Sequence, residues 1–437
     1  MKYNRWTICL TALGLVSPGS VIRAEEKANA VQTALASTTI SGYVDTSAQW
    51  NFGTGNANVA PYKFNSPSKS DGFNLDVVQI RIDKPLDEAD WAAGYRVDLW
   101  AGPDANVLGT QSTLSSGSSD FAIRQAYVLL QAPLGNGLTF KLGVFDSIIG
   151  YESVESPNDP NYTRSYGHSI EPQTHTGVLA SYRFTDLFRV SAGVADTVGP
   201  AINSRAQSGS AGFTSGPFQP YWNALYATVP TAPIPGSDPR AESYKTYMGS
   251  FDLTAPDTMG VLAGSTLYAG IVNGYNDSAF GSGVGDVETS YYVGGTIATP
   301  MTNLRLGAAF DYLDLGNVTT TATTGGNTIH FDGNAFAVAG YASLQATEKL
   351  SLHGRVEYTE TKLDFKMDGT PAFPDDRLKI FALTGTAQYD LWKNVLTRLE
   401  LRWDHSANGH NLFGGDTAGV PQARNAWMLA ANVIYKF

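Results

Sequence analysis

The chain contains a single cysteine, Cys9, among its 437 residues. This cysteine lies in a segment typical of secretion signals, where Lys2 and Arg5 precede a short apolar stretch and Ala24 provides a small residue for cleavage. A membrane anchor is the alternative, but the apolar stretch is short for one. Removal of residues 1–24 would leave no thiol, which excludes disulfide bonds, cysteine nucleophiles and cysteine metal ligands.

Long apolar runs are also missing, since none approaches the roughly 20 residues that a membrane helix needs. Charged residues make up only 16% of the chain. Sparse charge without a membrane helix is unusual for a soluble protein but ordinary for a barrel whose outer face meets lipid. After cleavage, 26 basic side chains would face 40 acidic ones, a formal charge of −14. Such an acidic balance argues against nucleic acid as a partner.

The dominant pattern is an alternation of apolar and polar residues in stretches of about 10–14, the length of a tilted membrane strand. In residues 91–99 the odd positions are apolar, and Gly94, Arg96 and Asp98 lie between them. Side chains of a strand alternate between its faces, so each stretch has one apolar and one hydrated face. The apolar faces carry aromatic residues at their ends, as bilayer interfaces favour: Trp91, Phe184, Phe188, Tyr312, Tyr358, Tyr389 and Trp403.

The connections between these stretches are sorted by length. Every second one is tight, as in residues 84–87 and 391–393, and the others are long, the longest being Gly199–Arg240. This layout predicts an all-β fold, a transmembrane antiparallel β-barrel of about 16 strands over residues 38–437, with short periplasmic turns and long extracellular loops. The expected strand starts are Thr38, Gly72, Ala89, Asp120, Asn136, Gln173, Leu187, Ala241, Gly260, Val287, Asn303, His330, Leu350, Asp376, Asn394 and Arg424.

Two terminal features complete this organisation. Residues 25–37 are polar and alanine-rich, which indicates a short periplasmic lead-in to the barrel. The last residues alternate apolar side chains up to Phe437, a pattern similar to the C-terminal signal that the barrel-insertion machinery reads. An unpaired apolar edge strand is the alternative, but it would be an aggregation liability unless it closed the sheet.

In a pore, function lies with the charged side chains on the hydrated faces of the strands. Arginines there would focus an electric field across the channel, although the charges could also simply pair with one another. Strand parity is ambiguous at Arg124 and Arg377, so neither is assigned. The expected pore-lining residues are Arg81, Arg96, Asp98, Lys141, Arg183, Arg189, Arg305, Asp311, Arg355, Glu357, Arg398, Glu400 and Arg402, with Asp404 on the same faces.

The third long loop, Asp146–Glu171, is the candidate constriction. Acidic residues on an inward-folded loop opposite wall arginines would create a transverse field, whereas an ordinary exposed loop would have no such effect. The candidate residues are Glu152, Glu155, Asp159, Asn161, Arg164 and Tyr166.

The same region resembles a known family. The runs 123–130, 142–145, 149–152, 161–166 and 172–178 are similar to those of the OmpL-like β-barrel porins, including the glycine-aromatic-glutamate at 150–152 and the His-x-Gly at 175–177. The resemblance covers the N-terminal half best, and the C-terminal half matches in rhythm and in its final phenylalanine. It implies a bacterial outer-membrane channel and points to Glu152, Asn161, Arg164, Tyr166 and His175 as residues to test.

Catalysis is not expected, because the six histidines are scattered and no Gly-x-Ser-x-Gly motif is present. His405 and His410 could bind a metal, but a solvated loop is the simpler interpretation, so no metal or cofactor is expected. We therefore expect a water-filled outer-membrane porin for small hydrophilic solutes, with a homotrimer as one form of assembly. The alternatives are a channel selective for anions, organic acids or sugars, and a plugged barrel that acts as a surface receptor or structural anchor.

Overall fold

The computed structural model describes residues 37–53, 55–110, 119–205, 244–275, 287–321, 328–367, 369–371 and 377–437. The predicted signal segment, most of the lead-in and most of the Gly199–Arg240 loop lie outside these ranges, so the predicted domain boundaries before residue 37 stay predictions. Residues Ile40–Phe437 form one structural unit.

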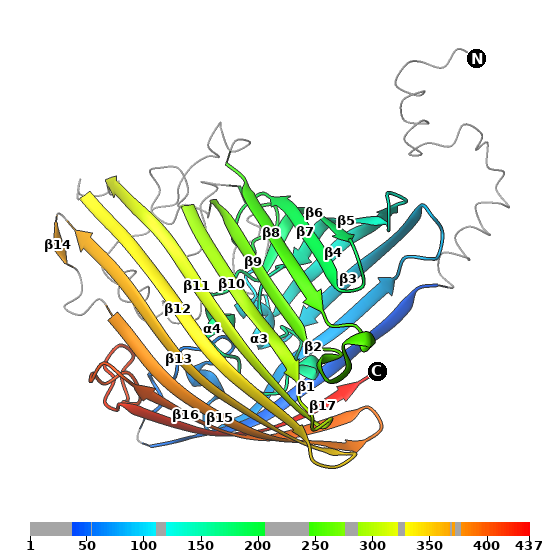
Figure 1. Ribbon diagram of the computed structural model, residues 1–437. Helices are drawn as coiled ribbons and strands as arrows, with labels where there is room; N and C mark the ends of the chain where they lie inside the picture. The colour runs from blue at the N-terminus through cyan, green and yellow to red at the C-terminus, as the bar shows by residue number, and fades with distance from the viewer. Residues whose placement is uncertain are drawn as a thin grey trace. The chain divides into compact units, whose positions relative to one another are not determined.

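Within the described ranges, sixteen antiparallel strands form a closed ring (Figure 1). The ring closes because β17 pairs with both β16 and β1, while β1 also pairs with β2. The strands are β1 Thr39–Phe52, β2 Gly72–Lys84, β3 Ala92–Ala101, β4 Phe121–Ala132, β5 Leu138–Asp146, β6 Thr174–Arg183, β7 Phe188–Ala195, β8 Thr246–Thr254, β9 Thr266–Tyr275, β10 Val287–Ala298, β11 Leu304–Thr321, β12 Thr328–Gln345, β13 Leu350–Met367, β15 Arg377–Trp392, β16 Val395–Ser406 and β17 Asn425–Lys436.

A seventeenth strand, β14 (Thr370–Pro371), pairs with the end of β13, while β13 and β15 pair directly, so the ring closes without it. The helices are short: α3 (Pro103–Val107), α4 (Tyr166–Ile170) and the 3-10 turns η1 (Pro67–Lys69), η2 (Ser156–Asn158) and η3 (Asp257–Leu262). No helix in the described part of the chain is long and apolar enough to cross a membrane. The prediction of an antiparallel barrel with about 16 strands is confirmed.

The burial of the side chains follows the predicted alternation. On β16 the even residues from Leu396 to Ser406 are buried, while the odd residues Leu399 and Leu401 are 53% and 45% exposed. A soluble sheet would bury its apolar face and expose its charges, so this inverted pattern is typical of a wall with lipid outside. Exposed aromatic residues gather at both rims, with Trp91, Phe184, Trp392 and Tyr435 near the short turns and Phe52, Phe121, Tyr247 and Trp427 near the long loops.

The short turns use residues that tolerate a left-handed backbone. Asn394, in the turn between β15 and β16, has φ 68°, a conformation that asparagine adopts more readily than most residues. Gly135, between β4 and β5, has φ 58°. The connection between β8 and β9 is longer than predicted because it contains η3, so β9 begins at Thr266 rather than at Gly260.

Candidate functional site

The loop between β5 and β6, residues 147–173, packs against inward-facing side chains of the wall, and we call it the β5–β6 loop. Its helix α4 contacts β11, β12 and β13. Tyr151 stacks on Tyr341 of β12, with ring centroids 4.1 Å apart. The loop therefore reaches strands that lie far from its own two strands around the ring.

Carboxylates of the wall accept hydrogen bonds from the main chain of this loop. Glu400 of β16 accepts from the backbone N–H groups of Tyr162, at 2.6 Å, and Thr163, at 3.1 Å. Glu357 of β13 accepts from the backbone N–H of Tyr166 at 2.7 Å, and the hydroxyl of the same tyrosine donates to Asp404 at 2.8 Å. Charge-assisted bonds to a carboxylate are among the stronger hydrogen bonds, so these acids anchor the loop.

Arginines of the same strands donate to loop carbonyl groups. Arg355 donates to the Thr163 carbonyl at 2.8 Å, and Arg402 to the Arg164 carbonyl at 2.9 Å. Arg398 donates to the carbonyl groups of Ser156 and Asp159. None of the three arginines is more than 3% exposed. Their guanidinium groups are thus covered by the loop.

Acidic residues of the loop bind cations on two sides of the barrel. Glu152 pairs with Arg355 at 2.8 Å, and both side chains are fully shielded from solvent. Glu155 pairs with Arg124 of β4 at 3.0 Å and with Arg81 of β2. The predicted loop acids and wall arginines are therefore in contact, and the loop bridges β2 and β4 to β13.

Two further loops pack beside the β5–β6 loop. The Arg402 guanidinium lies over the ring of Tyr62, at 4.0 Å from its centroid, and over that of Tyr166, at 5.1 Å. Tyr62 belongs to the β1–β2 loop, and Phe413 of the β16–β17 loop joins the same buried apolar cluster. Neither loop was predicted to pack inward.

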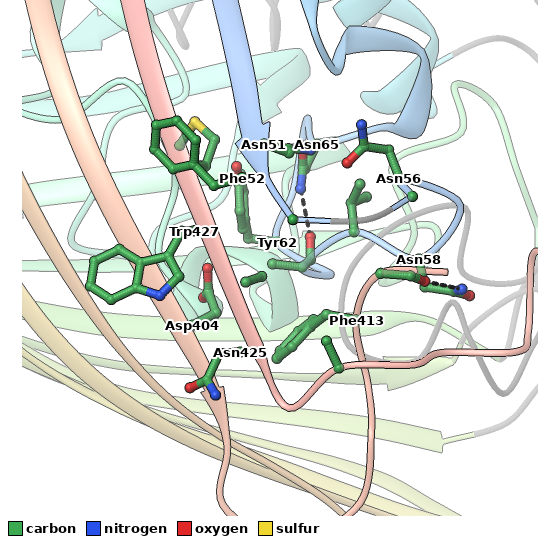
Figure 2. Close-up of a pocket in the computed structure, with 18 residues that line it drawn as sticks. Asn51, Phe52, Asn56, Asn58, Tyr62, Asn65, Asp404, Phe413, Asn425 and Trp427 are labelled. Atoms are coloured by element: carbon green, nitrogen blue, oxygen red, sulfur yellow. Dashed lines mark hydrogen bonds between the residues drawn. The ribbon is translucent and has the colours of Figure 1, made fainter. Parts of the chain in front are cut away.

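Figure 2 shows the residues that line a recess between these two loops and the rim of the barrel. Asn58 of the β1–β2 loop donates to the Gly414 carbonyl of the β16–β17 loop at 2.7 Å, and Asn65 donates to the Ala60 carbonyl within the β1–β2 loop at 2.8 Å. Asn425 accepts from Trp403 and lies opposite His405. The Asn58 contact ties the two loops to each other at the rim of the barrel.

Other predicted pore-lining cations remain solvent-accessible near the short turns. Arg183 and Arg305 are exposed, and Arg189 is 3.8 Å from Asp252. Arg96 pairs with Asp83 at 2.9 Å, and Lys141 lies 5.0 Å from the centre of the Tyr127 ring. The predicted set thus divides into cations covered by the loop and cations open to solvent.

Arg124 was left unassigned by the sequence and proves to be a central contact of the network. It donates to Asp98 at 2.9 Å, to Glu155 at 3.0 Å and to Asp146 at 2.5 Å. The register between β3 and β4 shifts at this point, so that Arg124 is the extra residue of a β-bulge and turns inward next to Gln125. A bulge leaves no simple signature in the alternation, which explains the omission. Arg377, also unassigned, is exposed and pairs with Glu360.

A buried ionisable cluster joins the end of α4 to β11. Burial, and then the facing Asp311, raise the pKa of Glu171 to about 8. Burial lowers the pKa of His168 to about 4 and that of Lys63 to about 7. The His168 ring lies 3.5 Å from the Glu171 carboxyl group. The docked loop therefore shields groups that would titrate differently in water.

The remaining candidates of the loop also have buried partners. Asp159 pairs with Arg164 at 2.7 Å, and Asn161 donates to the Thr386 hydroxyl at 2.7 Å. His175 is buried at the start of β6, with its Nε2 atom 3.4 Å from the Ser147 hydroxyl. Among the residues that the structure describes, no cluster of three or more histidine, cysteine or acidic side chains could hold a metal ion.

Solved structures of outer-membrane channels share this fold. The outer membrane channel DcaP of Acinetobacter baumannii is 12% identical, with a TM-score of 0.55, over 92% of this chain and 97% of that chain. Salmonella typhi OmpF, in complex with daunomycin, is 12% identical, with a TM-score of 0.54, over 92% of this chain and 97% of that chain. The anion-selective porin from Comamonas acidovorans is 11% identical, with a TM-score of 0.51, over 92% of this chain and 99% of that chain. At these identities the likeness concerns the fold alone.

No curated protein matches the sequence. Residues 37–437, by contrast, match the family described as "Putative beta-barrel porin-2, OmpL-like", which is the family that the loop motifs resembled. The match covers the entire barrel and its connecting loops. The chain therefore belongs to the OmpL-like β-barrel porin family, and it is an outer-membrane β-barrel of the porin type rather than an enzyme.

Proposed function

We propose that the protein is a channel for the passive diffusion of small hydrophilic solutes, and that the β5–β6 loop sets the width of the path. The observation that carries this proposal is the attachment of the loop main chain to the far wall by Glu357, Arg355, Glu400 and Arg402. A segment held across a barrel in this way narrows any path through it. Displacement of the loop would widen that path.

Conductance of the purified protein in planar bilayers tests this function. A channel predicts ohmic steps that grow with salt concentration, and a variant lacking residues 153–165 should conduct more than the wild type. A protein that inserts but conducts in neither form would contradict the proposal. Glu152 and Tyr166 remain in this deletion variant, so the loop can still close between β5 and β6.

A plugged barrel that serves as a receptor or anchor is the second candidate. It is favoured by the burial of wall residues from many strands, including Asp45, Ser290, Ala339 and Glu400, each at most 6% exposed. If the loops never leave the barrel, the wild type will insert without conducting, and only the deletion variant will show current. The same recordings thus separate the two candidates.

We also propose two partners beyond the lipid of the outer membrane. Phe437 exchanges backbone hydrogen bonds with Gly42, and its side chain is half exposed, so its ring is accessible to insertion machinery before the barrel closes. Deletion of Phe437 should slow membrane insertion in cells, and normal insertion would contradict this role. A homotrimer is tested by native mass spectrometry in detergent, where a monomeric mass would rule it out.

A further inference from the structure

The inward faces of β6 and β7 carry a pair of arginines near the short turns. Arg183 of β6 and Arg189 of β7 are direct partners in the antiparallel register. Both lie on the face that also carries the buried Leu179 and Ala195, whereas Val178 and Val194 on the opposite face are 38% and 39% exposed. Both guanidinium groups therefore point to the inside of the barrel.

This pair of like charges has little compensation from the protein. Side chains directly opposite on adjacent strands are about 5 Å apart at Cβ, and like charges there are destabilising. Asp252 lies 3.8 Å from Arg189, and in the described part of the chain no acidic group lies within ion-pairing distance of Arg183. The arrangement thus leaves at least one full positive charge in solvent.

Serine hydroxyl groups lie two residues from these arginines, on the same strands and the same inward faces. The Ser181 and Ser191 hydroxyls are 2.7 Å apart, and Ser250 is the register partner of Ser191 on β8. Thr139 is the register partner of Ser181 on β5. Hydroxyl donors beside guanidinium groups are the chemistry that recognises phosphate and carboxylate oxygens.

The cations covered by the β5–β6 loop provide a contrast. Arg355 and Arg402 are paired with Glu152, Glu357 and Asp404, and their side chains have no exposed surface. Arg183 and Arg189 face solvent instead, with Lys141 two residues from Thr139 on β5 and Arg305 exposed on β11. The acidic chain therefore has a locally basic inner surface, which would concentrate anions there.

We propose that Arg183 and Arg189, with the hydroxyls of Ser181, Ser191 and Ser250, form a binding site for a small oxyanion or carboxylate. The site gives the proposed channel its solute class, and to that extent rests on the proposed function. Each guanidinium offers a planar pair of donors to the anion, and the anion relieves the repulsion between the two arginines. The solute would bind at the short-turn end of the path through the barrel.

Equilibrium dialysis of the detergent-solubilised full-length protein tests the site without requiring conduction. The probes are radiolabelled inorganic phosphate and succinate at low ionic strength. The probe that binds with the higher affinity identifies the class of anion. We expect saturable binding that weakens with added salt, because the site is solvent-accessible. The double variant Arg183→Gln, Arg189→Gln should bind the anion at least about tenfold more weakly than the wild type, since it loses charge-assisted hydrogen bonds.

Arg377→Gln is the matched control, because Arg377 is an exposed arginine paired with Glu360 at the long-loop end of β15. It should bind like the wild type. Absence of saturable binding of both probes, or equal binding by the double variant, would overturn the site. A protein that binds phosphate but never conducts contradicts only the channel, and one that conducts with no saturable binding contradicts only the site.

Discussion

Loss of the Arg355 side chain should release the β5–β6 loop. This guanidinium donates to Glu152 at 2.8 Å, to the Thr163 carbonyl and hydroxyl at 2.8 Å each, and to the Arg164 carbonyl at 3.3 Å. Arg355→Met keeps much of the side-chain volume but leaves the buried Glu152 carboxylate without its cation. Breaking a buried ion pair by removing one partner costs about 3–5 kcal/mol.

We expect this cost to fall on loop docking rather than on the barrel, because the sheet hydrogen bonds of β13 do not involve the side chain. A change of about 3 kcal/mol corresponds to a roughly 100-fold rise in the population of the undocked loop. The assay is thiol labelling of Ile170→Cys, a residue of α4 that is 5% exposed. The introduced cysteine would be the labelled thiol, because Cys9, the only natural cysteine, lies in the predicted signal segment.

Arg305→Met in the same labelled background is the matched control. It removes the same charge from an exposed arginine near the short turns. Both variants should run as folded barrels in unheated gels, and only Arg355→Met should label faster. Equal labelling rates in Arg355→Met and Arg305→Met would refute the conclusion that the arginine anchors the loop.

Three further outcomes are expected. Arg124→Met should also speed labelling of Ile170→Cys, because it leaves Asp146 without its arginine partner and leaves Glu155 and Asp98 with Arg81 alone; an unchanged rate would mean that the bulge arginine does not hold the loop. Gly143→Ala should lower the temperature at which the barrel unfolds in gel shifts, by a stability loss of about 1–3 kcal/mol, since φ at this position is 132° and a Cβ would meet the Ala126 carbonyl; unchanged unfolding would show that β5 can adjust. Glu171→Gln tests the pH dependence of loop docking. Burial raises the pKa of Glu171 to about 8, so this residue stabilises the docked loop fully below its ordinary pKa of 4.5, and the stabilisation is lost as the pH rises through 8. The labelling rate of the wild-type loop relative to this variant should therefore rise between pH 5 and 8, whatever His168, Lys63 and Asp311 add to both; a constant ratio would contradict the shift.

Local periodicity was sufficient to predict the wall. The expected strand starts at Gly72, Val287 and Leu350 coincide with those of β2, β10 and β13, because alternation and turn residues are properties of short segments. Ala241 was placed five residues before the start of β8 at Thr246, where no turn signal marks the end of the long loop. The existence of each strand was thus easier to predict than its first residue.

Contacts between distant segments could not be predicted in the same way. The bond between Asn161 and Thr386 joins residues 225 positions apart, and nothing in either local sequence indicates the other. Likewise, the polar β1–β2 loop gave no sign that Tyr62 would cover Arg402. The residue types of the site were foreseen, but which arginines are covered and which are open to solvent depends on these long-range contacts.

The most direct test is to fix the β5–β6 loop to the wall and record the current. Cysteines introduced by Asn161→Cys and Thr386→Cys lie where the native side chains touch, so a short bismaleimide can join them. We predict that cross-linked channels keep a small, steady conductance and lose every larger opening seen in the untreated variant. Cross-linked and untreated channels with the same current would contradict control of the path by this loop.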